Sequence, residues 1–176
     1  MKKSLFVFVF ALIAFNFLKA QDQPTHINWM SIEEMEAANT KEPRKIIIDV
    51  YTDWCGWCKR MDKTTFQNPE IVRYINENYY AVKLDGEAQG VITFRDAEYK
   101  FVKQGKRGYH ELAATLLQGR MSYPSIVYLD ENLDMIQPVP GYKSPEQMEQ
   151  IIKYIGGSHY QTTEYEEFLK EFESAL

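Results

Sequence analysis

Both cysteines of this chain lie directly behind a short run of apolar, mostly β-branched residues. The run is KIIIDVY, residues 45–51, and it is followed by Cys55 and Cys58. A continuous run of this length is typical of a strand that is buried in a core. The first expectation is therefore a core strand whose far end carries both thiols of the protein.

Three roles are open for such a pair: structural staple, metal ligand or redox couple. A bridge across C-x-x-C closes so short a loop that it removes little entropy from the unfolded chain, which makes it a poor staple. A zinc site needs four ligands, but the chain has only two cysteines, and His26, His110 and His159 stand alone in the sequence. Seven methionines are too scattered to indicate a copper relay. The pattern favours thiol–disulfide exchange and predicts no metal site.

The first twenty residues differ from the rest of the chain. Two lysines precede the uncharged apolar run LFVFVFALIAFNFL, which Lys19 and Ala20 follow. This arrangement is typical of a secretory signal peptide cleaved near Ala20, and the run is short for a membrane span of about 20 residues. We therefore expect a signal peptide over 1–20 and one periplasmic or secreted domain over 21–176, with no membrane attachment after cleavage.

Composition narrows the possible partners. The chain has 176 residues, 45% of them hydrophobic, which fits one packed domain. Its formal net charge of −5 becomes more negative once the lysines of the signal segment are lost. Nucleic acid and anionic lipid are therefore not expected as partners.

Helix starts and further strands follow from local patterns. Three pairs of residues are typical of helix N-termini: Ser31 with Glu34, Asn68 with Pro69, and Ser144 with Pro145. The segments YAVKLDGE, PSIVYLD and MIQPVPG predict three more strands, the last two joined by the turn ENLD. A parallel crossover followed by a hairpin gives an α/β fold: a central mixed sheet with helices on both faces.

Two segments lie outside this regular alternation. Between residues 87 and 121 we expect a helical insertion, with helices over about 94–104 and 109–117. The tail is expected to form a helix over about 162–174. Its apolar stripe, which predicts a face docked onto the core rather than a partner site, consists of Tyr165, Phe168, Leu169 and Phe172.

The helix expected behind the strand suits the chemistry of the cysteine pair. A thiol attacks a disulfide only as the thiolate, and the free N–H groups and positive dipole end of a helix start favour that form. We expect Cys55 in the first turn, with Cys58 one turn further on the same face. Cys58 can then resolve a mixed disulfide formed on Cys55.

Asp49 is the one acid within the apolar strand. Buried there, its carboxyl group has a raised pKa and is placed to accept the proton of Cys58 when that thiol becomes a nucleophile. On a solvated face of the strand it has no chemical role. The pattern alone leaves both interpretations open.

Taken together, these segments resemble the thioredoxin-like family. IIIDVYTDWCGWCK, VKLD, YPSIVYLD and PGY occur in that order. They are similar to exported thioredoxin-related proteins and to the C-terminal domain of the membrane thiol:disulfide interchange reductase. The resemblance covers about residues 45–155, and its most specific part is Trp-Cys-x-x-Cys-Lys. It implies a thioredoxin-like three-layer sandwich with the helical insertion before the strand of a cis-proline.

The resemblance also implies roles for residues around the pair. Cys55 corresponds to an exposed nucleophile and Cys58 to a buried resolving thiol. Asp49 corresponds to the buried acid of the family, and Lys83 to the lysine that accompanies it. Both are expected to act in catalysis, which supports Asp49 as the proton acceptor.

A second group of residues is expected to bind the substrate. Pro124 corresponds to the cis-proline, and Tyr123 before it to the residue whose backbone pairs with the client. Trp54, Gly56 and Trp57 surround the cysteines, and the two tryptophans are expected to form an apolar lip. Two further family positions, Lys59 and Gly141, match without a specific role.

The expected function is that of an exported thiol:disulfide oxidoreductase, a reductase or an electron relay. Its redox group is the Cys55–Cys58 disulfide, with no other cofactor. Its partners are client proteins with disulfides or thiols and an upstream thiol electron donor. Gly56-Trp57 replaces the Gly-Pro of thioredoxin, which leaves the direction of electron flow open. The alternative is a thioredoxin-fold adaptor that binds proteins without essential redox turnover.

Overall fold

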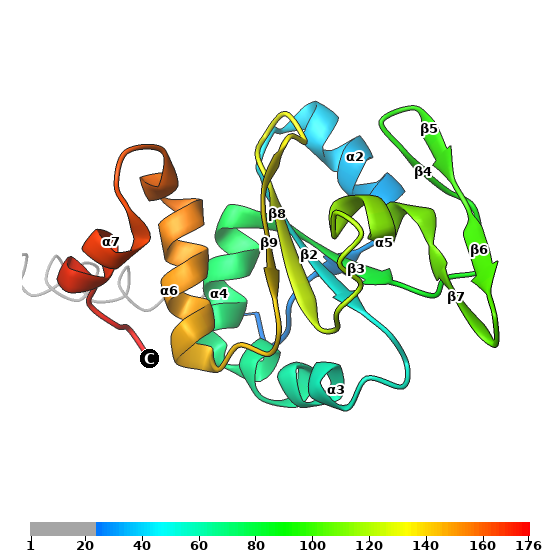
Figure 1. Ribbon diagram of the computed structural model, residues 1–176. Helices are drawn as coiled ribbons and strands as arrows, with labels where there is room; N and C mark the ends of the chain where they lie inside the picture. Colours follow the sequence, from blue (N-terminus) through cyan, green and yellow to red (C-terminus); the bar gives the residue numbers. More distant parts are fainter. Residues whose placement is uncertain (1–23) are drawn as a thin grey trace, which may run out of the picture.

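The computed structural model describes residues 24–176, so the expected signal peptide over 1–20 lies outside the described residues. A five-stranded sheet with the order β1-β3-β2-β8-β9 forms its centre (Figure 1). The strands are β1 (Trp29–Met30), β2 (Lys45–Tyr51), β3 (Tyr79–Asp85), β8 (Ser125–Leu129) and β9 (Met135–Pro140). The first three run parallel to one another, β8 is antiparallel to β2, and β9 is antiparallel to β8. The expected mixed sheet is confirmed.

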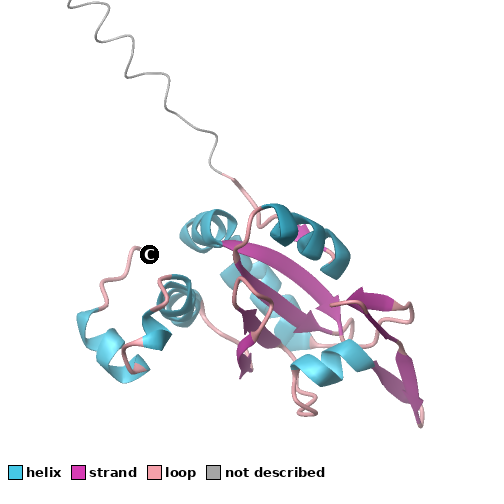
Figure 2. Ribbon diagram, turned by 90° about the horizontal axis from the view of Figure 1, so that it is seen from above, coloured by secondary structure: helices cyan, strands magenta, loops and turns pink. Residues whose placement is uncertain are grey.

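Helices cover both faces of this sheet, which also confirms the sandwich (Figure 2). On one face lie α2 (Ile32–Lys41) and α5 (Glu111–Leu116). On the other lie α3 (Gly56–Lys63), the 3-10 helix η2 (Thr65–Gln67), α4 (Pro69–Asn78) and α6 (Pro145–Gly156). Among residues 24–176, no helix combines the length and the apolar character needed to cross a bilayer.

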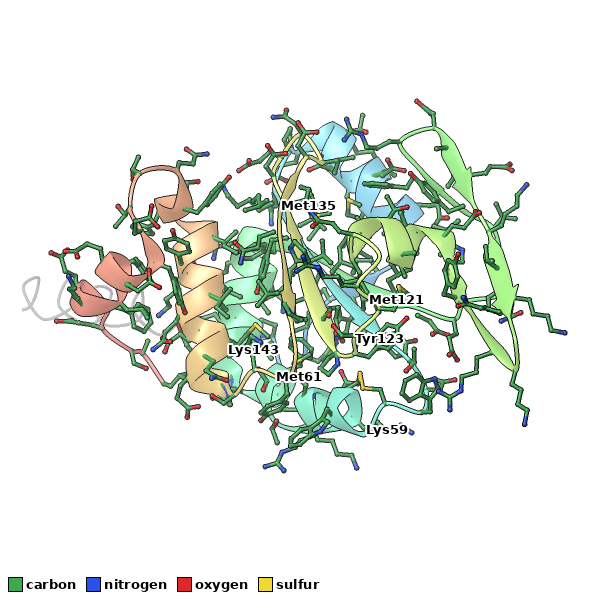
Figure 3. The ribbon with its side chains drawn as sticks, viewed as in Figure 1. Lys59, Met61, Met121, Tyr123, Met135 and Lys143 are labelled. Atoms are coloured by element: carbon green, nitrogen blue, oxygen red, sulfur yellow. A yellow bond between two sulfur atoms is a disulfide. The ribbon has the colours of Figure 1, made fainter. Side chains whose placement is uncertain are left out.

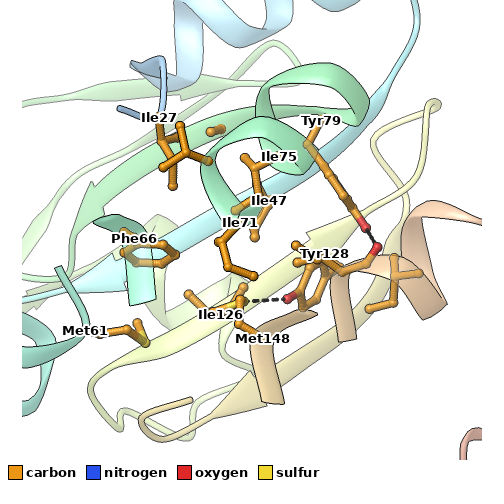
Figure 4. Close-up of a cluster of buried hydrophobic side chains, with 14 residues drawn as sticks. Ile27, Ile47, Met61, Phe66, Ile71, Ile75, Tyr79, Ile126, Tyr128 and Met148 are labelled. Carbon is orange, nitrogen blue, oxygen red and sulfur yellow. Dashed lines mark hydrogen bonds between the residues drawn. The ribbon is translucent and has the colours of Figure 1, made fainter. Parts of the chain in front are cut away.

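The central strand β2 supplies side chains to both layers. Ile46, Ile48 and Val50 pack against α2 and α5, and Ile47 packs into the cluster on the other face (Figure 4). Successive side chains of a strand point to opposite faces, so Asp49 shares the face of Ile47 and is directed towards the α3 layer. The buried strand of the sequence pattern is confirmed, including its two-sided burial.

The helix starts form as their capping residues indicate. Ser31 and Ser144 each make a complete capping box, and the side chain of Asn68 accepts hydrogen bonds from the backbone of α4. These bonds satisfy N–H groups that have no partner inside the helix. Such starts need only four or five consecutive residues, which explains why they could be predicted accurately.

The core extends further towards the N-terminus than the resemblance suggested. That resemblance began at about residue 45, but β1 pairs with β3, and Ile32 and Met35 of α2 are buried against the sheet. The segment directly before α2 is thus an edge strand of the sheet.

The expectation of a helical insertion is largely wrong. Residues 92–110 form two β-hairpins instead of a helix over 94–104: β4 (Ile92–Phe94) with β5 (Ala97–Tyr99), and β6 (Phe101–Gln104) with β7 (Arg107–His110). The helix expected over 109–117 exists only as α5, because the first two of those residues belong to β7. Turn geometry decides this: Arg95 and Asp96 both have positive φ, as a two-residue hairpin turn requires.

The tail docks onto α6, as expected. After the 3-10 helix η3 (His159–Gln161), α7 (Tyr165–Glu171) is shorter at both ends than the expected 162–174. Tyr154 of α6 contacts the rings of Tyr165 and Phe168 at 5.1 and 5.2 Å between centroids. The last residues return to the buried Glu149, whose carboxylate accepts hydrogen bonds from Ser174 and the N–H of Ala175.

Candidate functional site

The two cysteines sit at the start of α3 and form a disulfide with a Cα–Cα distance of 5.3 Å. Cys55 is the N-cap residue, and its Sγ accepts a hydrogen bond of 3.0 Å from the N–H of Cys58. The carbonyl of Cys55 accepts the first helical bond, from Lys59. The expected placement of the pair at a helix start is confirmed, and a backbone donor already points at the Cys55 sulfur.

Both sulfurs are turned inwards. Cys55 is only 4% exposed and Cys58 2%, so the expectation that Cys55 is exposed is wrong for the disulfide form. The cause is local: as N-cap, Cys55 folds its side chain back over the first turn, where it binds the N–H of Cys58 and the Cys58 sulfur. The exposed groups of this region are its neighbours Trp54 and Trp57, at 51% and 56%.

Asp49 is buried, 1% exposed, and the solvated alternative is therefore excluded. It pairs in register with Lys83 of β3, whose Nζ lies 2.6 Å from Asp49 Oδ2. Burial raises the pKa of the Asp49 carboxyl to about 6, although the Lys83 ammonium acts in the opposite direction. Its other oxygen, Oδ1, has no hydrogen-bond partner among the described residues. The Asp49 carboxyl group thus combines a pKa of about 6 with one buried oxygen that can still accept a hydrogen bond or a proton.

Lys83 also binds a residue that the sequence analysis did not identify. Its Nζ forms a second ion pair with Asp62, one turn after Cys58 on α3. Burial lowers the pKa of Lys83, but the two carboxylates outweigh it, and the pKa is raised. The signal for Asp62 was weak, because an acid on an amphipathic helix is normally a solvated surface group. Asp62 gains Lys83 as a partner only because α3 packs next to β3 in the folded protein.

Three aromatic rings surround the ammonium group of Lys83. Its Nζ lies 5.0 Å from the ring centroids of Trp29 and Tyr51 and 5.6 Å from that of Phe66. Such faces favour a cation electrostatically. The rings and carboxylates together keep Lys83 charged next to Asp49. The prediction that Asp49 and Lys83 belong together is therefore supported by direct contact.

The bond between Tyr123 and Pro124 is cis, as the resemblance implied. It precedes β8, whose first residue, Ser125, pairs with Val50 near the end of β2. The carbonyl of Pro124 accepts a hydrogen bond from Gly141, which has a φ of +84°. The ring of Tyr123 meets that of Trp54 edge-on, with centroids 5.9 Å apart. Tyr123 thereby lies beside the residue that precedes Cys55.

Gly86 leaves the space that the Tyr123 side chain fills. Gly86 was not identified from the sequence as part of the site. A Cβ at Gly86 would lie 2.3 Å from the Tyr123 hydroxyl oxygen and 2.7 Å from its ring. The backbone of Gly86 also joins the insertion to the sheet, because its carbonyl accepts a bond from the N–H of His110 and its N–H donates to Tyr51. A glycine within the predicted strand segment YAVKLDGE was the available signal.

Gly86→Ala is expected to displace the Tyr123 ring and destabilise the fold by about 1–3 kcal/mol, because the added methyl group overpacks the site. Thermal unfolding measures the loss, and near-ultraviolet circular dichroism reports the aromatic rearrangement. Gly90→Ala is the matched control, since no described atom beyond its two chain neighbours lies within 4 Å of the added Cβ. Equal melting temperatures for both variants would contradict this role of Gly86.

An arginine accompanies each exposed tryptophan. The guanidinium of Arg107, on β7, lies 4.4 Å from the Trp54 ring, and that of Arg60, on α3, lies 5.4 Å from the Trp57 ring. Trp57 also contacts Tyr142, with centroids 5.4 Å apart. The expected apolar lip therefore exists, but cations border it on both sides. Gly56 lies between the tryptophans as the first, exposed residue of α3.

Other residues considered for chemistry are not brought together. His110 is buried and caps α5 by accepting from the N–H of Leu112, a structural role. Met61 is buried in the core on the α3 face of the sheet, and Met121 packs against the core on the opposite face. Met135 is exposed on β9 (Figure 3). Lys59 is exposed on α3, and its N–H donates to the carbonyl of Cys55. Within residues 24–176, no three His, Cys, Asp or Glu side chains are grouped as metal ligands.

Comparison with known proteins gives one family. A model described as a thioredoxin-like domain matches residues 32–156. The thiol:disulfide interchange protein DsbD of Pectobacterium atrosepticum is 33% identical over 46 residues, 26% of this chain. Spermatogenesis-associated protein 20 of Mus musculus is 43% identical over 47 residues, 27% of this chain. The chain covers only 8% and 6% of the lengths of these relatives.

Among solved structures, a thioredoxin-fold protein from Helicobacter pylori is similar over most of the chain. The TM-score is 0.56, with 18% identity, and the match covers 89% of this chain and 91% of the other. At this identity the likeness concerns the fold. It agrees with the sheet order and with the helices on both faces described above.

Proposed function

The chain belongs to the thioredoxin-like family and carries the cysteine pair of a thiol:disulfide oxidoreductase, and we propose that it works outside the cytoplasm as a reductase or electron relay for protein disulfides. The observation that carries this proposal is the Cys55–Cys58 pair at the N-terminus of α3. Trp54, the residue before this pair, contacts Tyr123 of the cis Tyr123–Pro124 bond. Both a nucleophile and a resolving thiol are available there.

The exchange takes two steps. In the reduced protein the Cys55 thiolate attacks a client disulfide, so that a Cys55–client bond forms, the client S–S bond breaks and one client thiolate leaves. Cys58 then loses its proton and attacks Cys55 Sγ, which forms the Cys55–Cys58 bond and releases the second client sulfur. Two electrons pass from the dithiol to the client, and an upstream thiol donor restores the dithiol.

The second step needs a base, and Asp49 fits that role. Its Oδ1 is buried without a partner among the described residues, and its pKa is about 6. A carboxylate with such a pKa is mostly ionised at pH 7 yet accepts a proton more readily than an ordinary aspartate. Lys83 holds the other oxygen and fixes the orientation of the carboxyl group.

The remaining parts of the proposal rest on the sequence. The apolar segment within residues 1–20 supports export, and periplasmic or secreted localisation follows from it. The disulfide itself is the redox group, so no further cofactor is proposed. Clients are proteins with accessible disulfides or thiols. The direction of electron flow is that of a reductase, which the reduction potential tests.

The proposed function is tested by equilibrating the purified protein in a series of dithiothreitol and glutathione buffers, which together extend below the glutathione range, and alkylating its free thiols. We expect a two-electron transition between a dithiol and the Cys55–Cys58 disulfide, with a potential below the glutathione range. For a two-electron couple about 30 mV corresponds to about 1.4 kcal/mol, so the midpoint separates reductase from oxidant.

Two results would overturn parts of this assignment. If the thiols form no intramolecular disulfide at any ratio of reduced to oxidised glutathione, redox function fails and the adaptor alternative takes its place. A potential far above that of glutathione would instead identify an oxidant and reverse the proposed direction.

A further inference from the structure

The hairpin of β6 and β7 carries a local positive charge on an acidic protein. Lys103, Lys106 and Arg107 are exposed near its turn, and the sequence has no carboxylate between Phe101 and His110. In residues 24–176, none of the three cations has a carboxylate oxygen within ion-pair distance. The formal net charge of the whole chain is −5, so this patch is opposite in sign to the average surface.

Two adjoining hollows connect these cations with the redox site. One, of about 370 Å³, is lined by Glu87, Lys103, Lys106 and Arg107, among others. The second, of about 260 Å³, shares Glu87 and Arg107 with the first and extends to Trp54 and Tyr123. A chain lying in both hollows therefore passes the cations and reaches the residues next to Cys55.

The hairpin holds this position by several contacts. Arg107 lies 4.4 Å from the Trp54 ring centroid, which joins the turn directly to the lip of the site. A Cβ at Gly108 would lie 2.2 Å from the ring of Phe101, so the two strands are in close contact. At the base of the hairpin, the N–H of His110 donates to the carbonyl of Gly86, the residue that packs against the Tyr123 side chain. The hairpin is thus held beside Trp54, the residue that precedes Cys55.

On the basis of the proposed function, we propose that the two hollows bind an acidic, extended segment flanking the reactive cysteine of the partner protein. Three cations without counter-charges are complementary to the carboxylates of an acidic partner segment. The acidic surface around the hairpin repels the same carboxylates. Glu87 is the one carboxylate that lines both hollows, and it directs the acidic residues of the partner towards the hairpin turn. Such complementarity acts mainly on the rate of encounter.

Three synthetic peptides test this inference. Each carries one cysteine as a mixed disulfide with thionitrobenzoate, flanked by glutamate, glutamine or lysine residues. The reduced protein is expected to react with the glutamate peptide about tenfold faster than with the lysine peptide at about 20 mM NaCl. The ratio should approach unity at about 0.5 M NaCl, where the Debye length is a few ångströms.

Variants locate the effect. Lys103→Gln with Lys106→Gln should remove most of the preference while the rate with the glutamine peptide stays unchanged. Adding Arg107→Gln should abolish what remains of the preference. Arg107→Lys should keep the preference, because the charge remains. Glu87→Gln should increase it. The matched control removes three distant cations, by Lys41→Gln, Arg95→Gln and Lys170→Gln, and should leave the ratio close to that of the wild type.

The outcomes separate this inference from the proposed function. Reaction with the glutamine peptide reports redox function alone, and the ratio of the charged peptides reports the patch. Binding of serine-for-cysteine peptides to the oxidised protein, followed by fluorescence anisotropy, tests the patch even if no peptide is reduced. Equal binding and rates for both charged peptides, or a preference that survives the triple variant, would overturn the inference. Displacement of the glutamate peptide by phosphatidylserine vesicles would reassign the cations to a membrane surface.

Discussion

Cys58→Ser is expected to end turnover and to leave Cys55 covalently attached to client proteins. In the wild type, Cys58 lies one helical turn behind Cys55 and releases the client by forming the intramolecular disulfide. A serine hydroxyl cannot attack the mixed disulfide under these conditions, so the intermediate accumulates. Non-reducing electrophoresis of the variant after incubation with a disulfide-bonded protein measures the adduct. Dithiothreitol should reduce the mixed disulfide and release the client.

The partner variant separates the roles of the two thiols. Cys55→Ser should lose turnover equally but form few adducts, because the helix start and the N–H of Cys58 favour the thiolate of Cys55, which this variant lacks. Both variants should unfold at nearly the same temperature as the oxidised wild type, since the short disulfide loop adds little stability. If Cys55→Ser traps clients and Cys58→Ser does not, the two roles are reversed.

Asp49→Asn is expected to change both the pH dependence of stability and the rate of the resolving step. In the folded protein burial raises the pKa of Asp49 from 3.8 to about 6. The folded state therefore binds this proton more tightly than the unfolded state. The contribution of Asp49 to stability is largest below about pH 4 and is lost as the pH rises towards 6, by about 3 kcal/mol in total. The variant should lack this fall and be more stable than the wild type at pH 7.

The same substitution should slow catalysis. Without the carboxylate, Cys58 loses its proposed proton acceptor, and the release of client from Cys55 should fall about a hundredfold at pH 7, the lower end of the range for a positioned base. The rise of the wild-type rate around pH 6 should disappear. Single-turnover kinetics with a mixed-disulfide substrate, measured between pH 5 and 8, resolve this step.

Glu149→Gln is the matched control for Asp49. Glu149 is also buried, but hydrogen bonds from Lys153, Ser174 and the N–H of Ala175 outweigh its burial and lower its pKa. Its contribution to stability is therefore present near neutral pH and lost as the pH falls, opposite in sign to that of Asp49. Because Glu149 lies on α6 and binds the tail, its replacement should leave client reduction unchanged. A wild-type pH profile in the Asp49→Asn variant would contradict the proposed role of Asp49.

Much of the site could be predicted because its signals are local or tied to a short motif. The strand, the helix start at Cys55 and the caps at Ser31, Asn68 and Ser144 each depend on a few consecutive residues. The insertion was mispredicted for a related reason. Two helical patterns were inferred there, but the segment contains two tight hairpin turns, at Arg95 with Asp96 and at Gly105. At these turns the backbone φ, and not the side-chain pattern, is decisive.

The sequence by itself determined where the thiols sit, because a β-branched run followed by C-x-x-C specifies a strand and a helix start within fourteen consecutive residues, 45–58. Tertiary structure alone decided the surroundings: the ion pairs of Lys83 with Asp49 and Asp62, the seat of Tyr123 on Gly86, and the contact of Arg107 with Trp54. These partners are far apart in the chain. They meet only through strand register and layer packing, which depend on the free energy of the whole core and not on any one segment.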